Sequence, residues 1–194
     1  MIAFDDKTAL DVTDIQNDFA DPKGSLYVRG GEQVVPVANR EIERALAAGA
    51  LVVYTQDWHP ETTPHFRKDG GIWPVHCVQW TWGAEFHPEL HVAGEVVRKG
   101  TGGQDGYSGF SVRDPTSGAR FSTALEGMLR ERGIERLVVV GLATDYCVKE
   151  TALDSVRLGF QTAVLVEGVR AVDLTDGDGH RAIEEMRRAG VGIE

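Results

Sequence analysis

The sequence has few cysteines, no long hydrophobic run and a deficit of basic residues, and each shortage excludes a class of protein. Only Cys77 and Cys147 occur in 194 residues, which excludes a disulfide framework and favours a reducing, cytoplasmic compartment. No apolar run approaches the ~20 residues of a membrane-spanning helix, and residues 1–8 lack the apolar core of a signal peptide. The net charge of -10 makes a nucleic-acid partner unexpected.

Apolar segments of strand length alternate along the chain with segments of helical periodicity. The predicted strands cover residues 8–15, 50–55, 95–98, 137–140, 162–166 and 191–194. The predicted helices cover residues 32–48, 121–133, 145–159 and 179–189. Such alternation is typical of a parallel sheet with helices on both faces. Because no linker or repeat interrupts the pattern, we expect a single domain over residues 1–194.

Cys147 is the strongest candidate for a catalytic residue. It follows the predicted strand 137–140 and a Gly/Thr/Asp turn, at the start of a predicted helix. The unpaired N–H groups and dipole of a helix N-terminus favour a thiolate over a thiol. Backbone N–H groups of Ala143 and Cys147 are candidates for an oxyanion hole.

Asp14 and Lys99 also follow predicted strands, so we expect both to meet Cys147 at one edge of the sheet. A cysteine nucleophile needs a base or a lowered pKa. Asp14 would take the thiol proton, while Lys99 would keep Asp14 ionised and steady the thiolate. Taken singly, each residue has a simpler interpretation: a buried apolar cysteine, a capping aspartate and a solvated lysine.

A second cluster contains Asp57, His59, His65 and His76. An Asp-x-His pair on an extended segment places both side chains on one face, and two histidines of the following loop would complete a site. Carboxylate and imidazole ligands suit Zn, Mn or Fe. The alternative is a polar loop whose histidines are held by ordinary hydrogen bonds.

Taken together, six motifs in this order resemble the nicotinamidase/pyrazinamidase family of the isochorismatase-like hydrolase superfamily. They span nearly the whole chain and are Thr13-Asp-Ile-Gln-Asn-Asp-Phe19, Thr55-Gln-Asp-Trp-His59, Trp73-Pro-Val-His-Cys77, Arg98-Lys-Gly100, Tyr107-Ser-Gly-Phe110 and Gly141-Leu-Ala-Thr-Asp-Tyr-Cys147. The resemblance implies a three-layer α/β/α fold of the doubly wound type, with six parallel strands. It also implies hydrolysis of nicotinamide to nicotinate and ammonia in NAD salvage, pyrazinamide as a further substrate, and a monomer or homodimer.

The resemblance also implies roles for individual residues. Asp14, Lys99 and Cys147 match the catalytic aspartate, lysine and nucleophile of the family. Ala143 matches the oxyanion-hole residue, and the peptide bond that precedes it is cis in the family.

Further positions match residues that bind the metal and the substrate ring. Asp57, His59 and His76 match ligands of one divalent metal ion, whose identity the sequence leaves open among Zn, Mn and Fe. His65 matches a fourth ligand that only some members have. Three aromatic residues match positions that line the ring pocket: Phe19, Trp73 and Tyr107.

Two positions depart from the family pattern. Tyr146 stands beside the nucleophile where many members have histidine, and Thr13 precedes Asp14 where an aliphatic residue is usual. Neither removes a matched catalytic or ligand position.

Three other functions are possible. A relative that hydrolyses isochorismate or an N-carbamoyl compound would typically lack the metal cluster. A catalytically silent binding module would be expected to lose the catalytic residues. A structural zinc protein would favour closed, cysteine-rich ligation.

Overall fold

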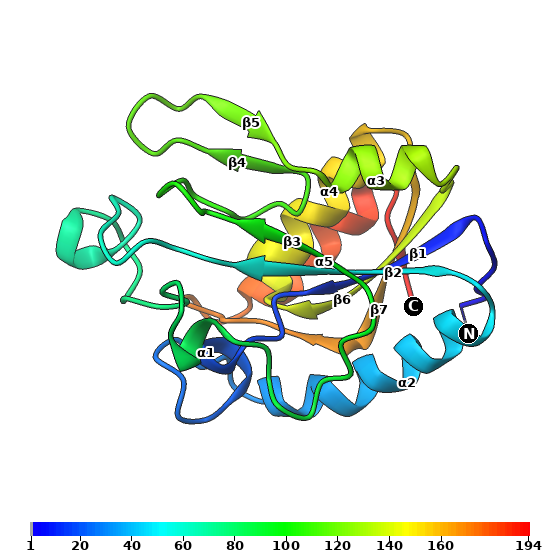
Figure 1. The fold of residues 1–194 in the computed structure, drawn as a ribbon, viewed down its shortest axis with the longest axis horizontal. Coiled ribbons are helices and arrows are strands. Elements are labelled where there is room, and N and C mark those ends of the chain that lie inside the picture. The colour runs from blue at the N-terminus through cyan, green and yellow to red at the C-terminus, as the bar shows by residue number, and fades with distance from the viewer. Residues whose placement is uncertain (1) are drawn as a thin grey trace.

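A six-stranded parallel sheet runs through the middle of the molecule, with the strand order β3-β2-β1-β6-β7-β8 (Figure 1). The computed structural model describes residues 2–194. The strands are β1 (Thr8–Thr13), β2 (Leu51–Asp57), β3 (Glu95–Lys99), β6 (Arg136–Leu142), β7 (Gln161–Arg170) and β8 (Gly192–Ile193). A separate antiparallel hairpin consists of β4 (Ser111–Arg113) and β5 (Arg120–Ser122).

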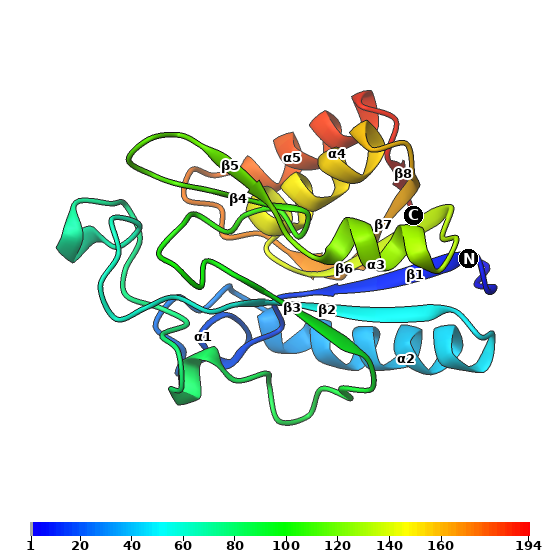
Figure 2. The same ribbon diagram turned by 45° about the horizontal axis from the view of Figure 1, so that its top comes forward.

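Helices cover both faces of the sheet. They are α1 (Asn17–Ala20), α2 (Val34–Ala47), α3 (Leu125–Glu131), α4 (Lys149–Arg157) and α5 (Asp178–Arg188). Short 3-10 helices form at Gly31–Gln33, Arg67–Asp69 and Trp82–Ala84, and a π-helical turn, Thr144–Val148, leads directly into α4. Helix α2 lies on one face of the sheet, and α3, α4 and α5 lie on the other (Figure 2). Among residues 2–194, none of these helices has the length and apolar character needed to cross a membrane.

Two buried hydrophobic clusters, one on each face, hold the layers together. Side chains of β1 alternate between them because successive residues of a strand point to opposite faces. Leu10 and Val12 belong to the α2 cluster, whereas Ala9 belongs to the cluster that includes Leu129 of α3 and Ala152 of α4. The expected three-layer α/β/α architecture with six parallel strands is therefore confirmed.

The predicted helix 121–133 is wrong at its start. Residues Arg120–Ser122 pair with β4 instead, and helix α3 begins only at Leu125. The Thr123 hydroxyl donates a hydrogen bond to the carbonyl of Gly109 at 2.5 Å, which fastens the chain to the preceding loop rather than to a helical turn. The predicted strands include no counterpart of β4 and β5, so the hairpin was not foreseen from the sequence.

Asp11 is a buried carboxyl in the central strand. It lies in register with Val53 and Val139 on the α3/α4 side of the sheet. Its Oδ2 accepts a hydrogen bond from the Thr13 hydroxyl at 3.0 Å, whereas its Oδ1 has no hydrogen-bond partner among the described residues. Burial raises the pKa of Asp11 to about 7; the Thr13 hydrogen bond opposes this shift and the charge of Asp14 adds to it.

Substitution of Asp11 by Asn is expected to stabilise the protein more at pH 8 than at pH 5. In the unfolded chain this carboxyl ionises near its ordinary pKa of 3.8, whereas the folded chain retains the proton up to about pH 7. The free energy of unfolding therefore falls as the pH rises between these values, by about 2–3 kcal/mol from pH 5 to pH 7. Asp11→Asn removes that dependence. Urea unfolding at both pH values measures the effect, and an equal gain at pH 5 and pH 8 would contradict it. The exposed Asp6→Asn serves as the control.

Candidate active site

The carboxyl ends of four neighbouring strands bring together the residues that the sequence singled out. Asp14 follows β1, Asp57 ends β2, Lys99 ends β3, and Cys147 lies in the π-helical turn after β6. The long segments that follow these strands gather at the same end of the molecule, on the left of Figure 1. One edge of the sheet thus carries all four side chains, as expected for an open parallel sheet.

Asp14 and Lys99 form a fully buried ion pair. Lys99 Nζ lies 2.6 Å from Asp14 Oδ2 and donates a second hydrogen bond, also at 2.6 Å, to the carbonyl of Gly106. The Thr55 hydroxyl donates to Asp14 Oδ1 at 2.7 Å. Asp14 has a φ of 49°, a left-handed conformation that few non-glycine residues adopt. The backbone therefore turns sharply at the residue whose carboxylate faces the lysine.

The Cys147 thiol is buried, which corrects the expectation that a helix N-terminus would favour its thiolate. Burial raises the pKa of Cys147 well above its ordinary value, although the Lys99 ammonium opposes this shift. Its Sγ lies within 4.8 Å of carboxylate oxygens of both Asp14 and Asp57. Burial also raises the pKa of Asp14, against the opposing effect of Lys99. A carboxyl with a raised pKa beside a protonated thiol is suited to exchange a proton with it.

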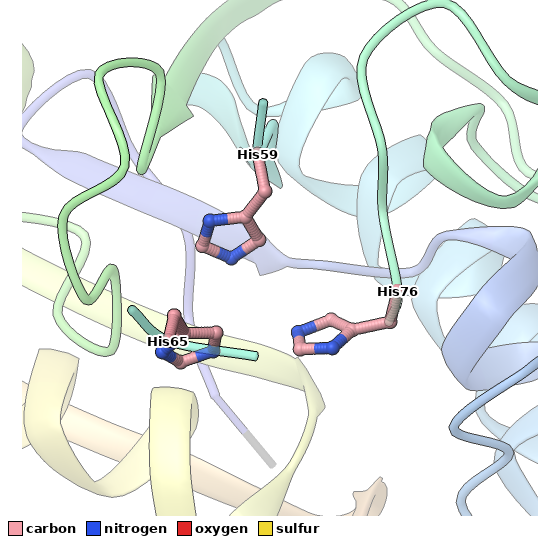
Figure 3. A group of neighbouring side chains, drawn as sticks. All are labelled: His59, His65 and His76. Atoms are coloured by element: carbon pink, nitrogen blue, oxygen red, sulfur yellow. The ribbon is translucent and has the colours of Figure 1, made fainter. Parts of the chain in front are cut away.

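Three histidines converge next to this group. The rings of His59, His65 and His76 face a common space (Figure 3), with one nitrogen of each within 4.8 Å of the others. Asp57 Oδ2 lies 3.6 Å from His59 Nε2 and 3.9 Å from His76 Nε2. The Asp-x-His spacing thus puts carboxylate and imidazole side by side, and the following loop brings the two other rings to them.

Unsatisfied polar atoms show that this cluster fits a divalent metal ion. Among the described residues, both ring nitrogens of His59 and Oδ1 of Asp57 are buried without a hydrogen-bond partner, although Lys99 Nζ lies 3.3 Å from that oxygen. Buried polar atoms are rarely left unpaired. Burial lowers the pKa of His76 to about 4, so this ring is neutral at pH 7 and its lone pair is free. Imidazole and carboxylate groups in this state are suitable ligands for Zn, Mn or Fe.

Asp57 is ionised in this setting. Burial alone would raise the pKa of Asp57, but the Lys99 ammonium above all, helped by the adjacent His59 side chain, holds it well below its ordinary value. Gly100 allows the necessary crowding, because a Cβ at this position would lie 2.5 Å from the His59 ring. The metal-ligand candidates and Lys99 therefore pack directly against each other.

A narrow, mainly apolar cavity connects the two groups. Asp57, His65 and His76 line one part of it, and Ala143 and Cys147 line another. Its aromatic walls are Phe19, Trp73, Tyr107 and Tyr146. The Trp73 indole N–H donates to the Tyr107 hydroxyl at 2.8 Å, and the Trp73 and Tyr146 rings meet edge to face with centroids 4.7 Å apart. A flat aromatic ring is the ligand shape that these walls favour.

The backbone before Cys147 has the conformation that the family resemblance implied. The peptide bond between Leu142 and Ala143 is cis. The carbonyl of Ala143 accepts hydrogen bonds from the backbone N–H groups of Tyr146 and Val148, both at 3.1 Å, and this arrangement closes the turn around the nucleophile.

Two polar side chains that were not predicted as site residues hold the backbone near the candidate metal ligands. Gln16 is fully buried; its Oε1 accepts from the backbone N–H of Asp57 at 2.8 Å, and its Nε2 donates to the carbonyls of Asp57 and Ala84 at 2.7 and 2.9 Å. Asp18 accepts the backbone N–H of Cys77 at 2.7 Å and so fixes the residue after His76. Both belong to the quoted motif around Asp14, but no spacing rule shows which backbone groups they contact.

Comparisons with known proteins agree with this architecture. The family model described as "Isochorismatase domain" matches residues 8–193. The chain belongs to the isochorismatase family. It is 42% identical over 196 residues to the nicotinamidase/pyrazinamidase of Mycobacterium tuberculosis, across 94% of this chain and 96% of that protein.

Two solved structures of the isochorismatase family's fold are also similar to this chain. One is the pyrazinamidase of Pyrococcus horikoshii in complex with zinc, which is 40% identical with a TM-score of 0.86 and coverages of 97% of this chain and 98% of that chain. The other is PnC1 from L. infantum in complex with nicotinate, which is 37% identical with a TM-score of 0.88 and coverages of 100% and 95%.

Substitution of Gln16 by Leu is expected to lower the free energy of unfolding by about 3 kcal/mol. Leu cannot pair with the backbone N–H and C=O of Asp57, and each unsatisfied buried group costs about 1–3 kcal/mol. Urea unfolding measures the loss. Gln161→Leu, at an exposed position at the start of β7, is the matched control and should change stability little. Equal losses in the two variants would show that the Gln16 contacts do not stabilise the site.

Proposed function

We propose that this isochorismatase-family protein hydrolyses nicotinamide to nicotinate and ammonia. One observation carries the proposal: Cys147, which lies beside the buried Asp14–Lys99 pair, lines the same aromatic-walled cavity as Asp57, His65 and His76 of the metal-ligand cluster. A carboxamide on an aromatic nitrogen heterocycle matches both ends of that cavity. The similar proteins named above support this substrate, and pyrazinamide, which has the same groups, is proposed as a second one. The product nicotinate would enter NAD salvage.

The proposed reaction begins with proton transfer from the Cys147 thiol to Asp14. The resulting thiolate attacks the carboxamide carbon and forms a C–S bond, while the carbonyl π electrons move to oxygen. Backbone N–H groups of Ala143 and Cys147 stabilise that oxyanion. Asp14 returns its proton to the amide nitrogen, the C–N bond breaks, and ammonia leaves a thioester on Cys147.

Hydrolysis of the thioester completes the cycle. Asp14 takes a proton from the attacking water, the new C–O bond forms, and the C–S bond breaks. The released sulfur recovers the proton from Asp14, so the resting thiol returns; the product acid loses its remaining proton to water or ammonia and leaves as nicotinate. Lys99 remains protonated throughout: the Asp14 and Asp57 carboxylates, despite burial, hold its pKa well above the ordinary value. Its ammonium therefore offsets negative charge on Asp14 and on sulfur.

Asp57, His59, His65 and His76 are proposed to hold one divalent metal ion, with zinc, manganese and iron as the candidates. When bound there, such an ion would supply Lewis-acid chemistry toward the ring nitrogen of the substrate. Positioning of this kind accelerates a reaction by holding the reacting atoms in place. The walls formed by Phe19, Trp73 and Tyr107 would then restrain the ring.

Ammonia release from nicotinamide is expected to depend on the metal. Protein as purified, protein treated with chelator, and protein reloaded with Zn, Mn or Fe would be compared in an ammonia assay. Activity should fall after chelation by at least tenfold and return with at least one metal. Release that survives proven metal removal would contradict the metal role. Absence of release in every state would contradict the proposed substrate, and N-carbamoyl compounds would then be tested as the alternative.

Two substitutions should separate the nucleophile from the ligands. Cys147→Ala removes the attacking sulfur and is expected to reduce turnover by at least ~1000-fold while it leaves the metal content unchanged. His59→Ala removes a ligand, so it should lower the metal content first. The activity should then fall as a consequence of the metal loss. Metal analysis by mass spectrometry, alongside the ammonia assay, tests this division. Equal metal loss in both variants would contradict it.

A further inference from the structure

Three consecutive residues on the glycine-rich segment after β3 each contact a different part of the site. Asp105 Oδ1 lies 2.7 Å from His65 Nδ1, the carbonyl of Gly106 accepts from Lys99 Nζ at 2.6 Å, and the Tyr107 hydroxyl accepts from Trp73 at 2.8 Å. One short stretch of chain therefore touches the histidine cluster, the buried ion pair and the ring cavity. The proposed mechanism gives no role to the Asp105 side chain.

The contact between Asp105 and His65 is a buried, directional hydrogen bond. The exposed fractions of the two side chains are 16% and 4%. A carboxylate oxygen accepts hydrogen bonds, so this contact favours the tautomer of His65 that carries its proton on Nδ1. The imidazole then presents the lone pair of Nε2 to the space that it shares with His59 and His76.

The backbone fixes Asp105 in a way that suits this role. Asp105 and Arg113 of β4 exchange two backbone hydrogen bonds, of 2.8 and 2.9 Å. The residue after Asp105, Gly106, is closely packed. A Cβ at this position would lie 2.8 Å from the Lys99 side chain and 3.2 Å from Asp57 Oδ1. The hairpin and the ion pair thus hold the carboxylate at one position relative to the His65 ring.

We propose that Asp105 is a positioning residue that fixes the tautomer and orientation of His65 and so makes His65 a ligand of the divalent metal. This inference rests on the metal site of the proposed function. His76 obtains the same effect differently: its Nδ1 donates to the carbonyl of Pro74 at 2.8 Å, so a backbone group performs for His76 what the Asp105 carboxylate performs for His65. Carboxylates that orient metal-bound histidines in this way typically change metal affinity by about 10- to 100-fold when removed.

Metal affinity without substrate tests the proposal. Zinc and manganese binding to metal-free protein would be measured by competition with a chromophoric chelator for wild type, Asp105→Ala, His65→Ala and the double variant. Asp105→Ala should weaken binding about 10- to 100-fold. The double variant should bind about as weakly as His65→Ala alone, because Asp105 acts only through His65. Asp176→Ala, at an exposed position, is the matched control and should bind like wild type.

The tautomer of His65 gives a second readout that does not require a folded variant. Long-range proton–nitrogen correlation spectra of the metal-free wild-type protein should show the proton of His65 on Nδ1. A proton on Nε2 would overturn the proposal. In Asp105→Ala, if it folds, the Nδ1–H tautomer should become less populated.

Two affinity results would also overturn the proposal: binding by Asp105→Ala as tight as wild type, or losses from Asp105→Ala and His65→Ala that simply add. These failures differ from a failure of the proposed function. If wild type hydrolyses nicotinamide but Asp105→Ala binds metal normally, only the role of Asp105 is wrong. If the affinity depends on Asp105 through His65 but nicotinamide is not hydrolysed, only the substrate is wrong.

Discussion

A single buried ammonium group connects the two halves of the site. Lys99 Nζ lies 2.6 Å from Asp14 and 3.3 Å from Asp57, and the lysine side chain is completely buried. A charge removed from water is tolerated only when opposite charges and hydrogen bonds surround it. The ends of β1, β2 and β3 must therefore stay aligned, since each supplies one member of this ion cluster. The same cluster supplies the proposed base and one proposed metal ligand.

The sheet turns residues that are distant in sequence into neighbours, and polar side chains then fix their positions. The register that pairs Asp57 with Lys99 across β2 and β3 sets the position of the lysine. Gln16 holds the backbone of Asp57 at both its N–H and its C=O. These contacts lie behind the cavity and face the protein interior, so the proposed reacting groups rest on a rigid support.

The parallel sheet and the gathering of Asp14, Lys99 and Cys147 at one of its edges were predictable from strong local signals, whereas the aromatic residues Phe19, Trp73 and Tyr107 were expected only from the family resemblance. Alternating strand and helix patterns indicated the parallel sheet, and residues immediately after strands, such as Asp14, had to gather at one edge. The β4–β5 hairpin was not predictable in the same way, because three-residue strands with exposed or half-buried side chains have no clear hydrophobic pattern. Asp105 was missed for a related reason: its partner His65 is 40 residues away, and only the tertiary fold brings the two together. The state of Cys147 was wrongly expected because burial outweighs the helix N-terminus, and burial depth is not visible in a short motif.

The burial of Cys147 has a consequence for the durability of the protein. Oxidants and alkylating reagents react with thiolates far faster than with thiols. Because burial raises the pKa of Cys147, its resting thiol is expected to react slowly with peroxide and with disulfides. Its nucleophilicity would arise only when a carbonyl carbon is already within reach and Asp14 accepts the proton. The cysteine would therefore react with a bound substrate more readily than with oxidants or disulfides.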